Sequence, residues 1–415
     1  MRRVHIVGAG LAGLAAATRL AEAGARVTVS EAAAQAGGRC RSYRDRRLGA
    51  IIDNGNHLVL SGNRAVADYL ARIGARDRLT GPDEARFAFV DLADGARWTV
   101  RPNDGRLPWW IARDTRRVPG TTLADHLALA RLLAPRDGAT VGETIPTSGP
   151  LWRRFVEPVL LAALNTPVAG ASAALAGAIV RESLGQGGRA CRPRIAAPTL
   201  AAAFVDPAVA FLAGRGDAPR LGRRLRAIGF AGDRVAALHF ADGEEPVGDD
   251  EAVILAVPPW VAAGLVPGLA VPDAHHAILN LHFRIAPPPG AEPMLGVIGG
   301  TAQWIFAFPD RVAVTISAAD ALRDEEREAL AGRVWGDVAA ALGLPPALPP
   351  WQIVREQRAT FAATPAQERR RPPAATRWRN LFLAGDWTRT GLPATIEGAI
   401  RSGDAAAMLA GRQEN

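Results

Sequence analysis

A glycine-rich turn between an apolar run and a helical pattern restricts the fold of this chain more than any other feature. The run Val4–Val7 reads VHIV, which predicts a short buried strand. It continues into GAGLAG and then into LAAATRLAEAG, which is typical of a helix. Gly8 permits the tight turn, Gly10 lets backbone amides approach a diphosphate, and Gly13 lets the helix pack closely on the sheet. The free amides and the dipole of the helix N-terminus favour the same anion, so Leu11 and Ala12 join the predicted site.

A second strand and an acidic residue extend this pattern. The predicted strand Arg26–Ser30 is followed directly by Glu31, where a carboxylate can accept hydrogen bonds from the two ribose hydroxyls of an adenosine. The chain then reads Gly37-Gly38-Arg39, and an arginine is permanently charged and suited to bidentate contact with a diphosphate. Strand, glycines, helix, strand and acid in register predict an α/β, Rossmann-like dinucleotide-binding domain.

The stretch from Gly8 to Arg39 resembles the flavoprotein superfamily of amine oxidases, protoporphyrinogen oxidase, phytoene desaturases and the Rab-GDP dissociation inhibitors. It fits G-x-G-x-x-G-L-x-x-A-x-x-L-x-x-x-G followed by V-x-V-x-E and G-G-R. The resemblance implies FAD as the cofactor, in a domain of the glutathione-reductase/amine-oxidase type. It also implies that the Gly-Gly-Arg segment runs along the FAD diphosphate.

The C-terminal region carries a second glycine-punctuated turn. NLFLAGDW, residues 380–387, is interpreted as a returning strand that ends at Gly385-Asp386. In the resembled families an Asp at this position binds the ribityl or phosphate end of FAD. GLPATIEGAIRSG then opens a helix whose positive end would stabilise the negative charge of reduced flavin. The residues assigned to flavin contact at this helix start are Pro393, Ala394 and Thr395.

Two more segments are assigned to the cofactor by the resemblance. The turn DNGNHLVLSG returns close to the flavin ring in the resembled fold, which adds Asn54, Gly55, Asn56 and His57. The run Val253–Val257 is interpreted as a buried strand closed by two prolines. In the stretch before it, Val235 matches the position whose backbone lies near the adenine.

The 415 residues are too many for one simple core, so we expect two domains. Segments 1–80, 185–270 and 373–415 are predicted to form a discontinuous FAD-binding domain. Segments 81–184 and 271–372 are predicted to form an α+β substrate-binding domain.

The substrate domain contains an uncharged run, Pro158–Val180. Its length allows a membrane span, but Asn165-Thr166-Pro167 and Gly170 interrupt it. We therefore favour two short buried helices that wall an apolar cavity, with ordinary core packing as the alternative. Trp109 and Trp110 are interpreted as core aromatics rather than as interfacial anchors.

Four short motifs carry a narrower resemblance. W…EP…LAALNTP…ASA, DNGNHLVLSG, QWIF and LAGDWTRTGLPATIEGAIRSG are similar to the hydroxysqualene dehydroxylases, squalene-associated flavoproteins of hopanoid biosynthesis. That family more often has Gln at the position of Asn56. The resemblance implies that reduced FAD delivers hydride to the allylic carbon of a C30 isoprenoid as its hydroxyl leaves, which gives squalene. The residues assigned to substrate are Leu164, Asn165, Gln303 and Trp304.

Departure of the hydroxyl needs a general acid near the flavin. His57 and Asp53 are the candidates. The alternative is that one or both only order the turn DNGNHLVLSG, residues 53–62, which we call the flavin loop. His275, His276 and His282 lack carboxylate or cysteine partners at ligand spacing, so no metal site is predicted.

Composition bears on the alternative functions. All 49 basic residues are Arg, so the active-site Lys of amine oxidation is missing. A carotenoid-type desaturase stays open, because it too needs a long apolar tunnel. An isoprenoid-binding chaperone on the same fold would lose the flavin site that this sequence retains. No second GxGxxG precedes an acidic residue, so no NAD(P)H site is expected and the electron donor is not identified.

Charge and cysteine content bear on partners and location. The formal charge is +8, but no aromatic residues are interleaved with a basic cluster, so nucleic acid is not an expected partner. Weak attraction to anionic lipid headgroups fits the charge better. Two cysteines, Cys40 and Cys191, fit a reducing compartment. We read no export signal and expect the protein in the cytoplasm or at the inner face of its membrane.

Overall fold

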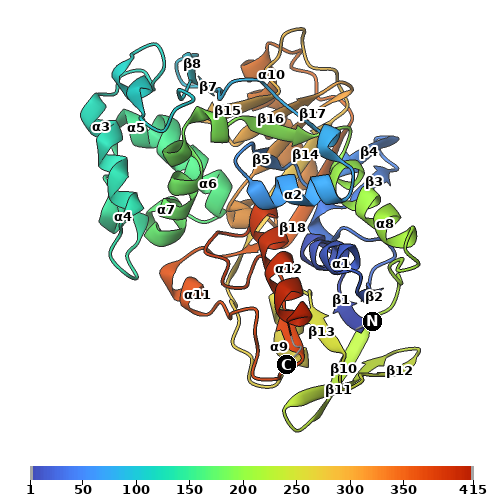
Figure 1. Cartoon of the computed structure of the whole chain (residues 1–415). Coiled ribbons are helices and arrows are strands. Elements are labelled where there is room, and N and C mark those ends of the chain that lie inside the picture. The colour runs from blue at the N-terminus through green and yellow to red at the C-terminus, as the bar shows by residue number, and fades with distance from the viewer. Residues whose placement is uncertain (1–2, 413–415) are drawn as a thin grey trace.

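A parallel four-stranded sheet forms one half of the molecule (Figure 1). The computed structural model describes residues 3–412, and the strand order is β19-β13-β1-β2. The strands are β1 (Arg3–Val7), β2 (Arg26–Ser30), β13 (Ala252–Leu255) and β19 (Leu381–Leu383). The strands predicted from the sequence are confirmed, although β13 and β19 are shorter than expected because the chain turns away at Ala256 and Ala384. Residues from the two ends of the chain thus lie in one sheet.

Two helices start at the carboxyl edge of this sheet and pack against each other. Helix α1 (Leu11–Glu22) follows β1, and α12 (Ile396–Gly411) follows β19. A side chain at Gly403 would lie 2.1 Å from the carbonyl oxygen of Ala12, so glycine permits their close approach. Helices α2 (Arg64–Arg72) and α8 (Asp206–Ala213) also contact α1. Because α1 is covered from several sides, nearly all of its side chains are buried.

A seven-stranded mixed sheet forms the second half, in the order β18-β14-β17-β16-β15-β7-β8. Helix α10 (Arg327–Leu342) covers one face, where Trp335 packs against Phe283. The strands are β7 (Phe87–Asp91), β8 (Arg97–Val100), β14 (His275–Phe283), β15 (Met294–Ile298), β16 (Trp304–Phe308), β17 (Arg311–Ile316) and β18 (Trp351–Phe361).

Short helices form a cap beside this sheet (Figure 1). The cap consists of η3 (Trp109–Ala112), α3 (Leu123–Ala128), η4 (Leu129–Leu133), α4 (Val141–Thr144), α5 (Gly149–Leu151), η5 (Trp152–Val156), α6 (Glu157–Leu164), η6 (Val168–Gly170) and α7 (Ala173–Glu182). The predicted pair of short helices is confirmed by α6 and α7. Within residues 3–412, no helix combines the length and apolar character needed to cross a bilayer. The core interpretation is correct for Trp110, which is buried, and wrong for Trp109, which is 47% exposed.

Smaller elements complete the structure. They include the pair β3 (Ser42–Asp45) and β4 (Ala50–Asp53), the sheet β5 (Leu58–Leu60), β6 (Leu79–Thr80) and β9 (Pro193–Ala196), the sheet β10 (Leu225–Ala231), β11 (Arg234–Phe240) and β12 (Gly243–Pro246), and helices α9 (Pro259–Leu265) and α11 (Pro365–Arg369). The parallel sheet draws its strands from segments 1–80, 185–270 and 373–415, and the seven-stranded sheet from 81–184 and 271–372. The boundaries of the two domains stay a prediction.

Candidate active site

The first glycine turn has the geometry that a diphosphate requires. Gly8 has φ +106°, and a Cβ atom there would lie 2.3 Å from the carbonyl oxygen of Ala256. A Cβ atom on Gly13 would lie 1.9 Å from the carbonyl oxygen of Gly8. Both positions therefore exclude any side chain. In contrast, a Cβ atom on Gly10 would meet nothing within 4 Å. The turn is closed behind and open in front, so these residues fit a bound diphosphate.

The Gly-Gly-Arg segment lies directly along this turn. The amide of Gly37 donates to the carbonyl of Ala9 at 2.8 Å, and Gly37 forms a parallel bridge with Gly10. A Cβ atom on Gly38 would lie 3.4 Å from the Cα atom of Gly10. The two glycine segments predicted to hold the diphosphate are thus adjacent in space, while their contact with it stays a prediction.

Glu31 is fixed at the end of β2. One of its carboxylate oxygens accepts from the amide of Ala9 at 2.7 Å, and the other accepts from the amide of Ala33 at 2.8 Å. An open depression of about 390 Å³ lies beside this turn. It is lined by Ala33, Gln35, Gly38, Arg41 and Tyr43. The location suits an adenosine whose ribose hydroxyls bind the carboxylate.

The prediction for Val235 does not fit the structure. Its amide donates to Oδ1 of Asn380 at 2.8 Å, and its carbonyl accepts from Nδ2 of the same side chain at 3.0 Å. Its amide is therefore not available to an adenine, and Val235 is itself fully buried. Residues 220–223 instead run beside β2, with the amide of Arg223 donating to the carbonyl of Glu31 at 2.7 Å. This segment, which the sequence did not single out, borders the expected adenosine site.

The C-terminal turn meets the N-terminal one through an ion pair. Gly385 has φ +149°, and a Cβ atom there would lie 2.3 Å from the indole nitrogen of Trp387. The next residue, Asp386, is buried and pairs with Arg39 at 2.7 Å. Arg39 also donates to the carbonyl of Ala359 on β18. Arg39 and Asp386 thus join both ends of the chain to the seven-stranded sheet.

Arg371 binds the backbone of the C-terminal turn. The sequence analysis did not identify this residue. Its side chain is fully buried and donates to the carbonyls of Asp386 and Thr388 and to the hydroxyl of Thr390. Glu368 pairs with it at 2.7 Å. One buried guanidinium therefore fixes the backbone that presents Asp386. The sequence signal for it, a run of arginines before two prolines, is indistinguishable from a surface stretch.

Helix α12 starts at a capped and anchored N-terminus. The hydroxyl of Thr395 accepts from the amide of Gly398 at 3.0 Å. The buried carboxylate of Glu397 accepts from the amides of Ala65 and Val66 at the start of α2. The helix terminus is thus held in place, and its amides give the positive end of the dipole. Contact of Pro393, Ala394 and Thr395 with flavin stays a prediction.

Asp53 is occupied by structural hydrogen bonds. It accepts from the hydroxyl of Ser42 at 2.5 Å and from the amide of Leu200 at 2.9 Å, and Arg311 lies 3.8 Å away. Burial raises the pKa of this carboxyl, while Ser42, Leu200 and Arg311 oppose the shift. These bonds tie the flavin loop to the helix that follows Leu200. They match the loop-ordering alternative, so a catalytic role for Asp53 stays an unsupported prediction.

The two asparagines of the flavin loop link it to the seven-stranded sheet. Asn54 donates to Glu356 at 3.3 Å, and Asn56 donates to Thr315 at 3.2 Å. Asn280 accepts from the amide of Asn56 at 3.3 Å. The side-chain oxygens of Asn54 and Asn56 are buried without a partner among the described residues. Because such oxygens normally find a donor, they are suited to accept from a polar group of the cofactor.

His57 is half-buried and near the ion pair. Burial lowers the pKa of its imidazole to about 4, Arg39 acts in the same direction, and Asp386 opposes it. Among residues 3–412, no protein group forms a hydrogen bond with it. An imidazole can act as a general acid near neutral pH only if its surroundings raise the pKa enough to keep it protonated. The role of His57 as general acid therefore stays a prediction.

The four residues assigned to substrate have different surroundings. Asn165 has φ 47°, donates to Thr360 at 2.9 Å and accepts from the amide of Ala318 at 2.6 Å. Gln303 bonds both backbone groups of Ser317. The Asn165 amide therefore holds the cap to the seven-stranded sheet, and the Gln303 amide joins the start of β16 to the end of β17 within that sheet. Leu164, beside Asn165, is buried in the apolar cluster between the cap and the sheet.

Trp304 differs, because its indole nitrogen is buried without a partner among the described residues. It lies directly opposite Thr315 on the neighbouring antiparallel strand. Directly opposed residues point to the same face, and the hydroxyl of Thr315 bonds Asn56 and Asn280 of the flavin-loop network. Trp304 therefore points to the face of the sheet that carries the flavin loop.

The glycine turns, the acidic residue after β2 and the returning C-terminal strand define a flavoprotein oxidoreductase. The chain belongs to the flavin containing amine oxidoreductase family, which matches residues 11–410. Its cofactor is FAD, and it is an enzyme.

Relatives of almost equal length are known by name. The chain is 55% identical over 410 residues to hydroxysqualene dehydroxylase of Rhodopseudomonas palustris, covering 98% of each chain. It is 49% identical to the protein of the same name from Zymomonas mobilis, covering 99% of each. The narrower resemblance of the sequence motifs is thus confirmed.

Solved structures share the fold. Cyclohexylamine oxidase from Brevibacterium oxydans superposes with a TM-score of 0.71 at 16% identity, covering 100% of each chain. A putrescine oxidase variant superposes with a TM-score of 0.68 at 18% identity, covering 99% of each. The predicted α/β flavoprotein architecture is therefore confirmed.

Proposed function

We propose that this enzyme removes the allylic hydroxyl of hydroxysqualene and produces squalene. The observation that carries the proposal is the near full-length identity of 49–55% to proteins named hydroxysqualene dehydroxylase. In the reaction the carbon–oxygen bond breaks, a carbon–hydrogen bond forms, and the hydroxyl leaves as water after it takes a proton. Bound FAD in its reduced form supplies the hydride, and with it both electrons.

The chain's own residues would bind and orient the reactants. The anchored N-terminus of α12 favours negative charge beside it, and Arg39 and Asp386 fix the turn next to it. Trp304 has a buried indole N–H, without a partner among residues 3–412, that can donate to the leaving oxygen. We assign the hydroxyl to this donor because a buried N–H group gains most when a partner arrives.

The remainder of an apolar C30 chain needs an apolar lining. The core cluster between the cap and the sheet contains Trp304, Phe306 and Phe308 of β16 together with Leu160 and Leu164 of α6. A C30 isoprenoid would pack against these side chains and be shielded from water there. The same cluster would suit a desaturase, so product analysis must separate the two activities.

We place the enzyme in the cytoplasm, at the inner face of the cytoplasmic membrane, as a peripheral protein. A C30 isoprenoid dissolves in the bilayer, and the formal charge of +8 favours an anionic surface.

A single anaerobic turnover in heavy water tests the proposal. Enzyme with fully reduced FAD and hydroxysqualene should give squalene and oxidised flavin. Because the hydrogen on flavin N5 exchanges with solvent, squalene should carry one deuterium at the former carbinol carbon. Squalene without deuterium would exclude hydride transfer from the flavin. Flavin that stays reduced would exclude the dehydroxylase, and activity on phytoene with oxidised flavin would favour a desaturase.

His57→Ala separates the two roles considered for this residue. If His57 donates the proton, turnover should fall by about two to four decades while FAD stays bound. If it only shapes the loop, FAD affinity and turnover should fall together. The measurement is single-turnover flavin oxidation beside an FAD titration of the apoenzyme. Unchanged turnover would contradict both roles.

A further inference from the structure

An exposed apolar patch lies on the cap, away from the parallel sheet. Helix α3, which carries part of it, is at the outer edge of the molecule (Figure 1). Five of the nine large hydrophobic side chains that the structure exposes fall in one short segment, residues 107–133. This cap patch consists of Leu107 (78% exposed), Trp109 (47%), Leu123 (43%), Leu127 (55%) and Leu133 (41%). Their concentration in one short segment separates them from singly scattered surface hydrophobics, which need no explanation.

The cap patch is held by buried side chains. Buried Asn103 donates to the carbonyls of Gly105 and Leu107 at 3.0 Å and accepts from the amide of Trp110 at 3.2 Å. Trp110 packs edge-on against His126 of α3 at 5.6 Å. The loop that presents Leu107 and the helix that presents Leu127 are thus fixed to the same core. Exposure here is built into the fold, since a frayed loop would not carry these bonds.

Unpaired arginines are interleaved with the apolar side chains. Leu123, Leu127 and Arg131 follow each other at intervals of four, which places them along one side of α3 and η4. The guanidinium of Arg116 lies 4.9 Å above the ring of Trp109. Arg113 is exposed and, within residues 3–412, forms no ion pair, and the same is true of Arg131.

The acidic residues of the segment do not cancel this charge. Residues 101–136 contain seven arginines and three aspartates, which gives a net charge of +4. Asp104 pairs with Arg192, Asp114 pairs with Arg117, and Asp125 caps its own helix through Thr122. The surface around the cap patch is therefore both apolar and cationic.

We propose that the cap patch docks the enzyme on an anionic phospholipid bilayer. Leucine and tryptophan side chains insert at the interface, and the arginines contact lipid phosphates. The combination distinguishes a bilayer from a protein partner, because dense cationic charge around an apolar centre matches a sheet of anionic headgroups over hydrocarbon. The inference deepens the proposed membrane contact and rests on the proposed function for its purpose, although docking requires no turnover.

Vesicle co-sedimentation of the FAD-loaded enzyme tests the proposal. The wild type should bind vesicles of phosphatidylglycerol and phosphatidylcholine, and much less to phosphatidylcholine alone. Leu107→Ser/Leu127→Ser should lower the partition coefficient by about tenfold or more, because two exposed leucines no longer enter the interface. Arg113→Gln/Arg131→Gln should lower it by about fivefold for each arginine on anionic vesicles, with little change on neutral ones.

Matched variants on other surfaces provide the controls. Met408→Ser removes a 42%-exposed side chain from α12, and Arg226→Gln removes an exposed arginine from β10. Both should bind vesicles as the wild type does. All variants should keep wild-type FAD content and melting temperature, since the replaced side chains are exposed.

Several outcomes would overturn the proposal. Patch variants that bind like the wild type would do so, as would a wild type that ignores anionic vesicles. A dimer that dissociates in Leu107→Ser/Leu127→Ser, with vesicle binding unchanged, would show instead that the patch covers a second copy. Turnover of detergent-dispersed hydroxysqualene is measured separately. Its absence would refute the proposed function and leave the vesicle result intact.

Discussion

At the scale of single residues, Glu31 is the side chain on which FAD affinity should depend most directly. The amides of Ala9 and Ala33 already hold its carboxylate, so the ribose meets a fixed acceptor. Glu31→Ala should weaken FAD binding by about one to two decades, since the lost hydrogen bonds are worth roughly 1–3 kcal/mol. Titration of the apoenzyme with FAD measures this. Glu22→Ala, at an exposed acidic residue of α1, is the control. Equal flavin occupancy of the two variants under limiting FAD would contradict the assignment.

His282 is the basis of a second prediction about a single residue, which concerns how the stability of the protein depends on pH. It is fully buried on β14, and its Nε2 atom contacts the carbonyl of Asp53 at 3.1 Å. Burial lowers the pKa of its imidazole to about 4, aided by Arg311. The unfolded chain therefore takes up a proton near pH 6.5 that the folded protein refuses until about pH 4. This part of the stability is complete above pH 6.5 and is lost as the pH falls towards 4.

The loss should reach about 3 kcal/mol at pH 4, from a shift of roughly 2.5 pKa units. His282→Gln removes the titrating group, so its free energy of unfolding should fall less steeply over this range. Urea unfolding of both proteins at a series of pH values, with excess FAD, measures the difference. Parallel curves for wild type and variant would show that folding does not lower the pKa of His282.

Elements read from local pattern were predicted well, and those that depend on distant partners were not. The strand β2 and the helix α1 follow from hydrophobic spacing and glycine positions that lie within each segment. Asn380 bonds Val235 across 145 residues, and Asn280 bonds Asn54 across 226. Side-chain bonds to remote backbone have no periodicity, so no window of the sequence contains them. The Val235 prediction failed for this reason.

The exposure of side chains on the cap could not be predicted from local sequence either. A tryptophan pair in an apolar stretch gives no sign of which ring is buried, because that depends on Asn103 and His126. The flavin loop was assigned by resemblance, but its link to Thr315 and Asn280 depends on the register of β14 and β17. That register is set by tertiary packing.

At the scale of elements, the packing of α1 on α12 supports a prediction about glycine. A Cβ atom at Gly403 would lie 2.1 Å from the carbonyl oxygen of Ala12 and 3.0 Å from the Cβ atom of Ala15. Gly403→Ala should therefore separate the helices and destabilise the protein by about 1–3 kcal/mol. It should also weaken FAD binding, because both helices begin at the predicted cofactor site. Thermal unfolding with and without FAD measures both effects.

Gly411→Ala, in the last turn of the same helix, is the matched control. A Cβ atom there would meet nothing within 4 Å. Its gain in helix propensity, up to about 1 kcal/mol, should raise stability slightly. If Gly403→Ala also raised stability, the close approach of α1 and α12 would be disproved.

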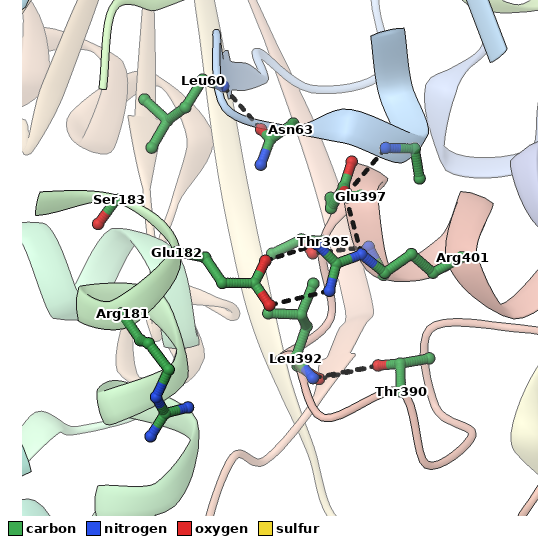
Figure 2. Close-up of polar contacts among 12 residues, drawn as sticks. Leu60, Asn63, Arg181, Glu182, Ser183, Thr390, Leu392, Thr395, Glu397 and Arg401 are labelled. Carbon is green, nitrogen blue, oxygen red and sulfur yellow. Dashed lines mark hydrogen bonds and ion pairs between the residues drawn. The ribbon is translucent and has the colours of Figure 1, made fainter. Parts of the chain in front are cut away.

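At the scale of the whole molecule, an arginine links the cap to the flavin-binding half. Arg401 on α12 pairs with Glu397 at 2.8 Å and with both oxygens of Glu182 at 2.9 and 2.6 Å (Figure 2). Glu182 is the last residue of α7, so the contact joins the end of the cap to α12. Because it pairs with carboxylates on both sides, Arg401 is suited to fixing the cap to the flavin-binding half.

Arg401→Met should loosen the cap without unfolding the flavin-binding half. Glu397 keeps its bonds to the amides of Ala65 and Val66, and Glu182, which is 36% exposed, can turn to solvent. Because the lost ion pair is partly screened by water, the effect should be modest: amide exchange in α7 about two- to fivefold faster, with exchange in α10 unchanged. Hydrogen–deuterium exchange followed by mass spectrometry resolves the two helices.

The neighbouring arginine, Arg181, provides the control for the contact between the cap and the flavin-binding half. Arg181 points away from the Glu182–Arg401 pair in Figure 2 and donates to the carbonyl of Leu133 within the cap. Arg181→Met should therefore leave the contact between the two halves intact and alter exchange only near η4. Added salt should reduce the difference between wild type and Arg401→Met, since exposed charges are screened. Equal acceleration in α7 and α10 would mean that Arg401 stabilises the protein as a whole, and that the cap has no separate freedom to open.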